Sequence, residues 1–202
     1  DALHKMFRGV SKEDAVKAVA VLEGKVPSAA PEVQALADSM RDLLRGHFRS
    51  LTGVEFDDAG RIIKNAQGTP EIDSAVLDPM GRMLKVVDSA GNEEDLAQHF
   101  IENYFPHRLK EEWFSKAGQS KLRQELVDAG MPETKVDQWL QRQINAKPKK
   151  IGHIELKRER DLPDLAYETN PLKVLPQYFA NTIRRHELSK EFGVGGEILD
   201  YL

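Results

Sequence analysis

The stretch from Pro31 to Gly53, PEVQALADSMRDLLRGHFRSLTG, predicts one long helix in the first half of the chain. Its apolar residues recur at spacings of three and four, which places them on one face of an α-helix. Proline suits the first helical position, and glycine commonly follows the last turn. The apolar residues are Val33, Leu36, Ala37, Met40, Leu43, Leu44 and Phe48. Such a stripe must pack against other helices, so the stretch favours a mainly helical fold.

Further helices are expected on both sides of this stretch. Ser11 and Asp14 form the start of a helix that continues to Gly24. In the second half, caps, prolines and glycines delimit five predicted helices: one capped by Asn92 and ending near Tyr104, one from Leu109 to Lys116, one from Ser120 to Ala129, one from Pro132 or Glu133 onwards, and one opening at Asn170-Pro171. Because Pro176 falls inside the last helix, we expect either a kink or a helix that begins at Pro176.

The segment from Val54 to Asn92 has a different pattern. An apolar residue followed by Asp-x-x-Gly occurs at Phe56–Gly60, Leu77–Gly81 and Val87–Gly91, and the first two copies continue as Arg, two apolar residues and Lys. An aspartate side chain accepts hydrogen bonds from the backbone that follows it, and glycine tolerates a positive φ. The pattern therefore predicts tight turns between short strands, with a strand from Arg82 to Val87.

These elements predict a mainly α fold with a small β-hairpin or meander insertion, an α+β arrangement. We expect a helical unit at residues 1–53, a β-rich insertion at residues 54–92 and a C-terminal helical unit at residues 93–202, all sharing one packed body. The chain of 202 residues starts without a methionine or a signal-peptide pattern and ends on an apolar run, so we expect an excerpt of a longer protein.

Composition and charge exclude some classes of chemistry. The chain has no cysteine, which excludes disulfides, thiolate nucleophiles and thiolate zinc sites. No apolar run is long enough to span a bilayer. Residues 55–103 carry eleven acidic and four basic side chains, whereas residues 104–190 carry seventeen basic and twelve acidic ones. The basic half predicts a surface for DNA or another partner, or else two solvated surfaces of opposite charge.

A helix-turn-helix pattern occupies residues 121–145. Leu126, Gly130, Val136 and Trp139 fall at the offsets of two core helices and a glycine turn. In the DNA-binding interpretation, the second helix enters a major groove and presents Gln138, Gln141, Arg142 and Asn145 to the bases. The acidic Glu133 and Asp137 would then face phosphates, so an ordinary helical hairpin is the alternative.

A basic stretch follows this pattern. Its cationic side chains are Lys147, Lys149, Lys150, Lys157, Arg158 and Arg160. A flexible basic arm neutralises phosphates without selecting a sequence, and the alternative is a solvated linker. Residues 151–160 fit either a strand or an extended arm. A second set combines aromatic residues with arginines, as protein interfaces do: Tyr104, Phe105, Trp113, Tyr178, Arg184, Arg185 and Phe192.

The pattern predicts no catalytic residues, no cofactor-binding residues and no metal site. His107, His153 and His186 are widely separated, and no His-x-x-x-His pair is present. The aspartate turns lack the alternating carboxylates of a calcium-binding loop. The glycines from Gly193 to Gly196 follow a helix and lack the lysine of a phosphate loop, so they predict a helix stop.

Several short pieces between residues 100 and 202 resemble the large polyvalent and internal virion (ejection) proteins of tailed bacteriophages. The pieces are Glu102-Asn103-Tyr104-Phe105-Pro106-His107, Lys157-Arg158-Glu159-Arg160, Asn170-Pro171-Leu172-Lys173-Val174-Leu175, Tyr178, Arg184-Arg185 and Glu191-Phe192-Gly193. The resemblance implies a large, modular, mostly helical protein of the virion or the host cytoplasm. It implies that this segment is a non-catalytic structural module that contacts other virion proteins or itself, with DNA as a further candidate partner through residues 104–190. The alternatives are a helix-turn-helix DNA-binding module and an accessory domain of a larger phage enzyme.

Overall fold

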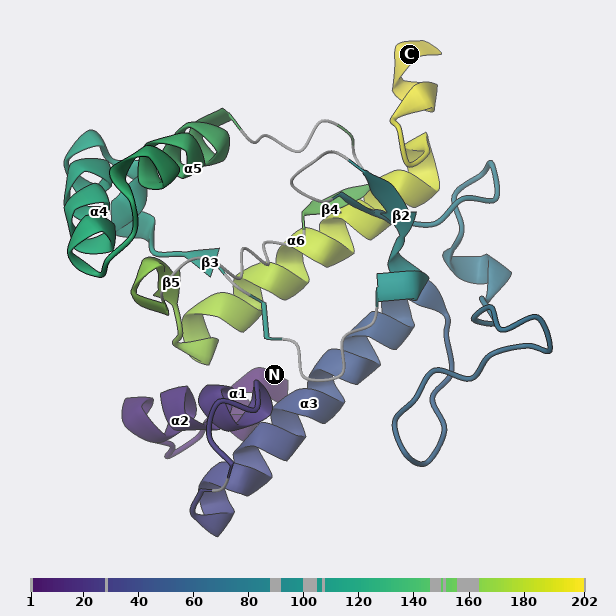
Figure 1. The fold of residues 1–202 in the computed structure, drawn as a ribbon. Coiled ribbons are helices and arrows are strands. Elements are labelled where there is room, and N and C mark those ends of the chain that lie inside the picture. Colours follow the sequence, from purple (N-terminus) through teal and green to yellow (C-terminus); the bar gives the residue numbers. More distant parts are fainter. Residues whose placement is uncertain are drawn as a thin grey trace.

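The computed structural model describes residues 2–27, 29–87, 92–99, 105–106, 108–145, 150, 152–155 and 164–201. Two 22-residue helices form its frame, α3 (Pro31–Thr52) and α6 (Pro171–Phe192). They lie side by side and run in the same direction (Figure 1). The short helix α1 (Ala2–Met6) and helix α2 (Lys12–Leu22) lie near the beginning of α3.

Local capping sets the ends of these helices, as the sequence predicts. The Ser11 hydroxyl accepts a hydrogen bond from the backbone N–H of Asp14 at the start of α2. Helix α3 ends at Gly53, whose φ of 68° is the left-handed conformation that favours glycine. The Asn170 side chain caps α6, which continues through Pro176. The alternative start at Pro176 is therefore wrong.

The continuity of α6 through its proline has a local explanation. Pro176 has no N–H to donate to the carbonyl of Leu172, one turn earlier. Leu172 lies in the first turn of the helix and is 45% exposed. The missing bond thus falls near the start of the helix at an exposed residue, where it costs less than in a buried helix interior.

The strands are few and short. Strand β1 (Lys85–Val87) pairs antiparallel with β2 (Glu93–Asp95) and parallel with β4 (His153–Glu155), which gives the order β2-β1-β4. Strands β3 (Arg108–Leu109) and β5 (Tyr167–Glu168) form a separate antiparallel pair. The mainly α fold with a small β component is thus confirmed. Strand β4 also confirms the strand alternative for part of residues 151–160.

The predicted helix beginning at Asn92 is wrong over the residues that the structure describes. Glu93–Asp95 is strand β2, and Leu96–His99 is the 3-10 helix η2. The acidic residues that suit a helix start pair instead with lysines: Lys85 with Asp95, and Lys150 with Glu93. Leu96 is buried, and its N–H donates to the Leu84 carbonyl at 2.9 Å. Strand pairing and burial here outweigh local helix preference. Residues 100–104 lie outside the described part of the chain.

The α4–α5 hairpin projects away from the two long helices (Figure 1). Ser115 caps α4 (Lys116–Asp128), and α5 (Glu133–Asn145) follows a turn at Gly130 with φ 91°. Helix α4 thus begins four residues before the predicted Ser120. The predicted helix at 109–116 is instead the 3-10 turn η3 (Glu111–Phe114). The remaining 3-10 turns are η1 (Ser74–Val76), η4 (Asp164–Ala166) and η5 (Glu197–Tyr201).

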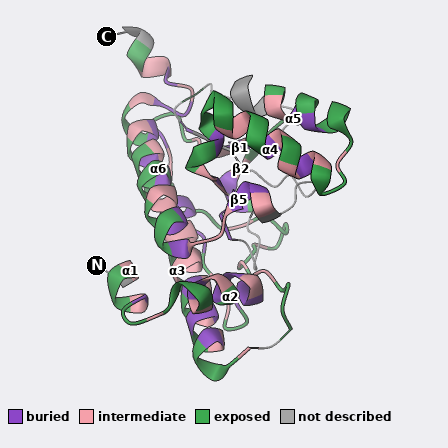
Figure 2. Ribbon diagram, turned by 90° about the vertical axis from the view of Figure 1, so that its left-hand side faces the viewer, coloured by how far each residue is buried: buried purple, intermediate pink, exposed green. Residues whose placement is uncertain are grey.

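Three hydrophobic clusters hold the elements together. The first joins α2, α3 and the start of α6, where Val174 and Leu175 pack with Met40. The second joins the α4–α5 hairpin to Trp113 of η3 and to the β3–β5 pair, through Leu109 and Tyr167. The third joins Leu51 at the end of α3 to Val86 of β1 and to η2. In Figure 2 the buried residues of α2, α3 and α6 alternate with exposed ones along each helix, as amphipathic helices require.

Candidate functional site

Three turns in the β-rich region share one hydrogen-bonding scheme. In each, the side-chain oxygen of the first residue accepts from the backbone N–H groups two and four positions later: Asp57 from Ala59 and Arg61, Asn65 from Gln67 and Thr69, and Asp78 from Met80 and Arg82. The glycine between the two donors of each turn, Gly60, Gly68 or Gly81, has a φ of 73° to 78°. This scheme confirms the predicted turn chemistry at Asp57 and Asp78. The third predicted copy, residues 87–91, lies mostly outside the described part of the chain.

The sequence pattern Asp-x-x-Gly does not include the Asn65 turn. Asn-x-x-Gly supplies the same side-chain acceptor as Asp-x-x-Gly, because an amide oxygen also accepts two backbone hydrogen bonds. The more general pattern Asx-x-x-Gly therefore predicts this turn as well, at Asn65–Gly68.

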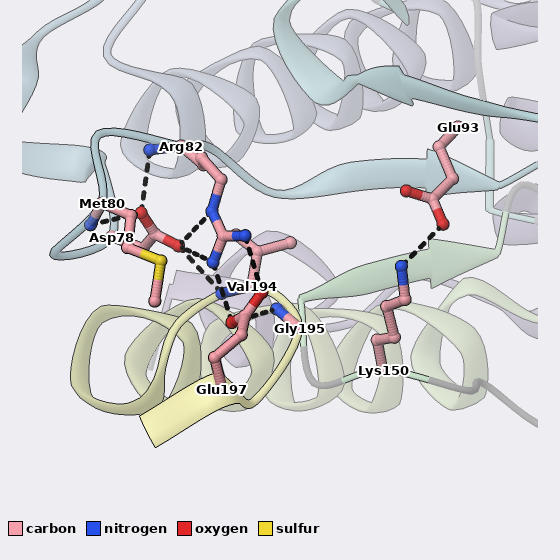
Figure 3. A network of polar contacts seen from close by, with 8 residues as sticks. All are labelled: Asp78, Met80, Arg82, Glu93, Lys150, Val194, Gly195 and Glu197. Atoms are coloured by element: carbon pink, nitrogen blue, oxygen red, sulfur yellow. Dashed lines mark hydrogen bonds and ion pairs between the residues drawn. The ribbon is translucent and has the colours of Figure 1, made fainter. Parts of the chain in front are cut away.

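The turn from Asp78 to Arg82 is docked against the loop that follows α6 (Figure 3). The Asp78 side chain is fully buried, and its Oδ2 accepts from the Val194 backbone N–H at 2.9 Å. The Arg82 guanidinium donates to Asp78 and binds the Glu197 carboxylate through two bonds, at 2.6 and 2.8 Å. The Gly195 N–H also donates to Glu197, at 3.0 Å. One arginine thus joins two carboxylates that are far apart in the sequence.

Charges in this network are held in their ionised forms. Burial is the largest influence on Asp78 and acts to raise its pKa, but hydrogen bonds from Arg82 and Val194 outweigh it, and the pKa is lowered. The hydrogen bond from Arg82 lowers the pKa of Glu197 to about 2. The two carboxylates in turn raise the pKa of Arg82. Glu197 is not predictable as a site residue from the sequence, because nothing local marks it as a partner of a turn over a hundred residues away.

The turn from Asp57 to Arg61 has the same internal bonds but is open to solvent. The Arg61 guanidinium donates to Asp57 Oδ2 through Nε at 2.9 Å, and its Nη2 lies 2.8 Å from the same oxygen. The Arg61 side chain is 77% exposed. A hollow of about 870 Å³ lies beside this turn, between the turns at Asp57 and Asn65 and helix η2. Asp57, Arg61 and Lys64 are its charged lining residues.

The contact between α3 and α6 is partly polar. His47 Nε2 lies 2.6 Å from the Thr182 hydroxyl, and the His47 ring stacks at 4.4 Å from the Phe179 ring. Burial lowers the pKa of His47 to about 4, with a further contribution from the nearby His186. Burial also raises the pKa of Tyr178 to about 12. The imidazole of His47 is therefore neutral at physiological pH and helps to join the two long helices.

The outer face of α6 carries exposed apolar residues at successive turns. Leu172, Pro176, Ala180 and Ile183 are all exposed, and Ile183 is 48% exposed. Their spacing of four, four and three places them on one side of the helix. We call these four residues the α6 stripe. Leu175 and His186 of the same helix are buried, whereas Leu172 and Ile183 are not.

The predicted helix-turn-helix residues form a hairpin whose core is shared with Trp113 and Tyr167. Leu122, Leu126, Val136 and Trp139 are buried between α4 and α5. Arg123 donates to Asp137 at 2.7 Å and to Glu133 at 3.3 Å, so the acids of α5 are paired within the hairpin. Among the predicted base-contacting residues, Gln138 and Gln141 are exposed on α5, whereas the side chains of Arg142 and Asn145 are outside the description.

The structure describes one of the six cationic residues of the basic stretch, Lys150. Lys150 forms an ion pair with Glu93 at 3.1 Å, and its carbonyl accepts from Arg185 at 3.2 Å. The other five, Lys147, Lys149, Lys157, Arg158 and Arg160, lie outside the described residues.

The predicted interface residues occupy different environments. Phe105 and Trp113 are buried in the first and second clusters. Tyr178 packs edge-on against His47, Arg184 is exposed and Phe192 is half-buried. Tyr104 lies outside the described residues. The sequence set therefore does not form one surface: Phe105 and Trp113 stabilise two separate cores.

In the described part of the chain, no three His, Cys, Asp or Glu side chains converge as ligands for a metal ion. Over the same residues, no helix combines the length and the apolar character that crossing a bilayer requires.

The comparisons with known proteins add no relative: no family model, no curated protein and no solved structure matches the chain.

Proposed function

We propose that this chain is a structural and interaction module of a phage virion-associated or DNA-ejection protein. It acts by binding other virion proteins or a second copy of itself. The phage context rests on the resemblance of residues 100–202 and the binding role on the surface of α6.

The α6 stripe is the observation that carries the binding role. Helix α6 already buries one side in the first cluster, through Val174 and Leu175. Leu172 and Ile183 are nearly half exposed on another side, three turns apart. Both side chains are already about half buried, so covering the remainder of each contributes about 1 kcal/mol and favours association. A rigid helix of six turns also holds the stripe in one geometry, which lowers the entropy cost of binding.

Light scattering on the purified protein, together with cross-linking of phage particles that carry it, tests this role. We expect either a discrete oligomer or cross-links from α6 to another virion protein. Replacing both Leu172 and Ile183 with lysine should abolish the association. Leu199→Lys is the matched control, because Leu199 is 46% exposed and lies outside the stripe. A monomer without cross-links, or equal association in the double variant, would contradict the proposal.

A DNA-binding role for the α4–α5 hairpin is the second candidate. The hairpin with its glycine turn and buried core supports it, and so do the exposed amides of Gln138 and Gln141. This candidate predicts binding to short duplex DNA that weakens steeply as salt rises. Gln138→Ala should then reduce sequence preference by about 1–3 kcal/mol at one base pair. The absence of salt-dependent binding would exclude this candidate and leave the α6 role untouched.

A further inference from the structure

The turns at Asp57 and Asp78 are two copies of one platform. Both have the form apolar-Asp-x-x-Gly-Arg-apolar-apolar-Lys, from Phe56 to Lys64 and from Leu77 to Lys85. In both, the aspartate Oδ1 accepts two backbone N–H groups, and the aspartate Oδ2 accepts from the arginine side chain. The distances agree within 0.1 Å for the Nε bond, at 2.9 and 3.0 Å. The two platforms therefore present the same chemical groups in the same order.

The second platform shows what such a turn binds. Its ligand is the segment Gly193-Val194-Gly195-Gly196-Glu197, whose Val194 N–H reaches Asp78 and whose glutamate reaches Arg82 (Figure 3). Glycines suit this loop, because Gly193 and Gly196 have φ values of 84° and 80°, a conformation that favours glycine. The recognised unit is thus a glycine-rich loop in which a backbone N–H precedes a glutamate by three residues.

The first platform has no such ligand within the described chain. There Arg61 contacts no carboxylate other than Asp57. The hollow of about 870 Å³ opens beside it, and Arg61 and Lys64 give its lining more positive than negative charge. Arg61 and Asp57 form an ion pair, so the net positive charge of the lining comes from Lys64.

We propose that the Asp57–Arg61 turn is a docking site for a glycine-rich, glutamate-bearing loop of a partner protein. The glutamate carboxylate pairs with Arg61, and a backbone N–H three residues earlier donates to Asp57 Oδ2, as Glu197 and Val194 do at the second turn. The proposal rests on the proposed function, because it takes the partner to be a protein. It adds the kind of loop through which that partner binds. It uses a surface other than the α6 stripe.

A peptide that copies residues 191–199 is the direct probe, with blocked ends and with a second version in which glutamine replaces Glu197. Each peptide is titrated into the ¹⁵N-labelled protein at millimolar concentrations, where weak binding is detected. We expect saturable shifts of the amide signals of Gly60, Arg61, Lys64 and Gln98, about tenfold weaker for the glutamine peptide. Arg61→Gln should weaken the native peptide to a similar extent. Arg8→Gln is the control, because Arg8 is an exposed arginine far from the hollow in sequence.

Four outcomes would overturn the proposal. They are the absence of saturable shifts, equal binding by the two peptides, unchanged binding by Arg61→Gln, and equal shifts produced by inorganic phosphate. Shifts confined to Asp78, Arg82 and Gly195 would also count against it, since the peptide would then only displace the chain's own loop. Arg61→Gln leaves both Oδ1 bonds of the Asp57 turn in place, so folding is preserved. Light scattering on the protein and on its Leu172 and Ile183 variant tests the α6 stripe independently of the peptide titration. Failure of this docking site can therefore be distinguished from failure of the proposed function.

Discussion

The turns at Asp57 and Asp78 have the same sequence pattern and the same local bonds, yet the Asp78 carboxylate is buried and the Asp57 carboxylate is partly exposed. The Asp78 carboxylate has no exposed side-chain surface, whereas the Asp57 side chain is 34% exposed. The difference comes entirely from the loop after α6, which brings Val194 and Glu197 to the second turn. Local sequence therefore determines the shape of a turn, while its place in the fold determines what the turn contributes to stability.

The largest expected effect comes from removing the arginine of the docked turn. Arg82→Gln leaves the buried Asp78 carboxylate without its charged partner and also releases Glu197, so unfolding free energy should fall by about 3 kcal/mol. Arg61→Gln should change it by no more than about 0.5 kcal/mol, because its ion pair is exposed. Urea denaturation of the two variants beside the unmodified protein measures both values. Equal losses would show that docking does not distinguish the two turns.

Acid titration separates the docked turn from the α3–α6 contact. The pKa of His47 is about 4 in the folded protein, below its ordinary 6.5, so the unfolded chain takes up the proton first as pH falls. Stability from the neutral His47 is therefore complete above pH 6.5 and is lost between pH 6.5 and 4, by about 2 kcal/mol. Glu197, with a pKa of about 2 instead of 4.5, contributes stability above pH 4.5 that is lost towards pH 2.

Two variants assign these windows. His47→Gln should flatten the stability curve between pH 6.5 and 4, and Arg82→Gln should flatten it between pH 4.5 and 2. Urea midpoints measured across this pH range provide the curves. A curve that keeps its slope above pH 4.5 in the His47 variant would mean that another group titrates there.

Replacing the turn glycines should lower stability by a smaller amount, and here the Asp57 turn should be more sensitive than the Asp78 turn. Alanine at either Gly60 or Gly81 must adopt a positive φ, which costs about 1 kcal/mol. At Gly60 the added methyl also meets the Arg45 guanidinium, whereas nothing lies within 4 Å of a Cβ at Gly81. We expect Gly60→Ala to destabilise by about 0.5 kcal/mol more than Gly81→Ala. Thermal denaturation of the pair measures the difference, and a larger loss at Gly81 would show that the docked turn is the less tolerant one.

The smallest effect concerns the third turn. Asn65→Asp keeps the oxygen that accepts from Gln67 and Thr69, so we expect a change within about 0.5 kcal/mol. Asn65→Leu removes that acceptor and should cost about 1 kcal/mol. Urea denaturation of both variants compares them, and equal losses would mean that the side-chain acceptor contributes nothing to this turn.

Much of the fold follows from short-range patterns. The caps at Ser11 and Asn170, the stop at Gly53 and the Asx turns were all predictable, because each depends on bonds between residues within four positions of one another. The candidate sites were less predictable. The α6 stripe appears only after the structure shows which side of the helix is buried, since Leu172 and Leu175 are equally apolar in the sequence and only Leu175 is buried.

The sequence by itself determined the starts of α2 and α6, the end of α3 and the turns at Asp57 and Asp78, because capping and turn bonds are local. Only the tertiary structure decided that residues 93–95 form a strand, that β4 joins β1, and that Glu197 binds Arg82 and not Arg61. Those choices join residues from six to more than a hundred positions apart. Such contacts form only when burial of a shared core offsets the entropy of closing the intervening chain, and no local pattern encodes that balance.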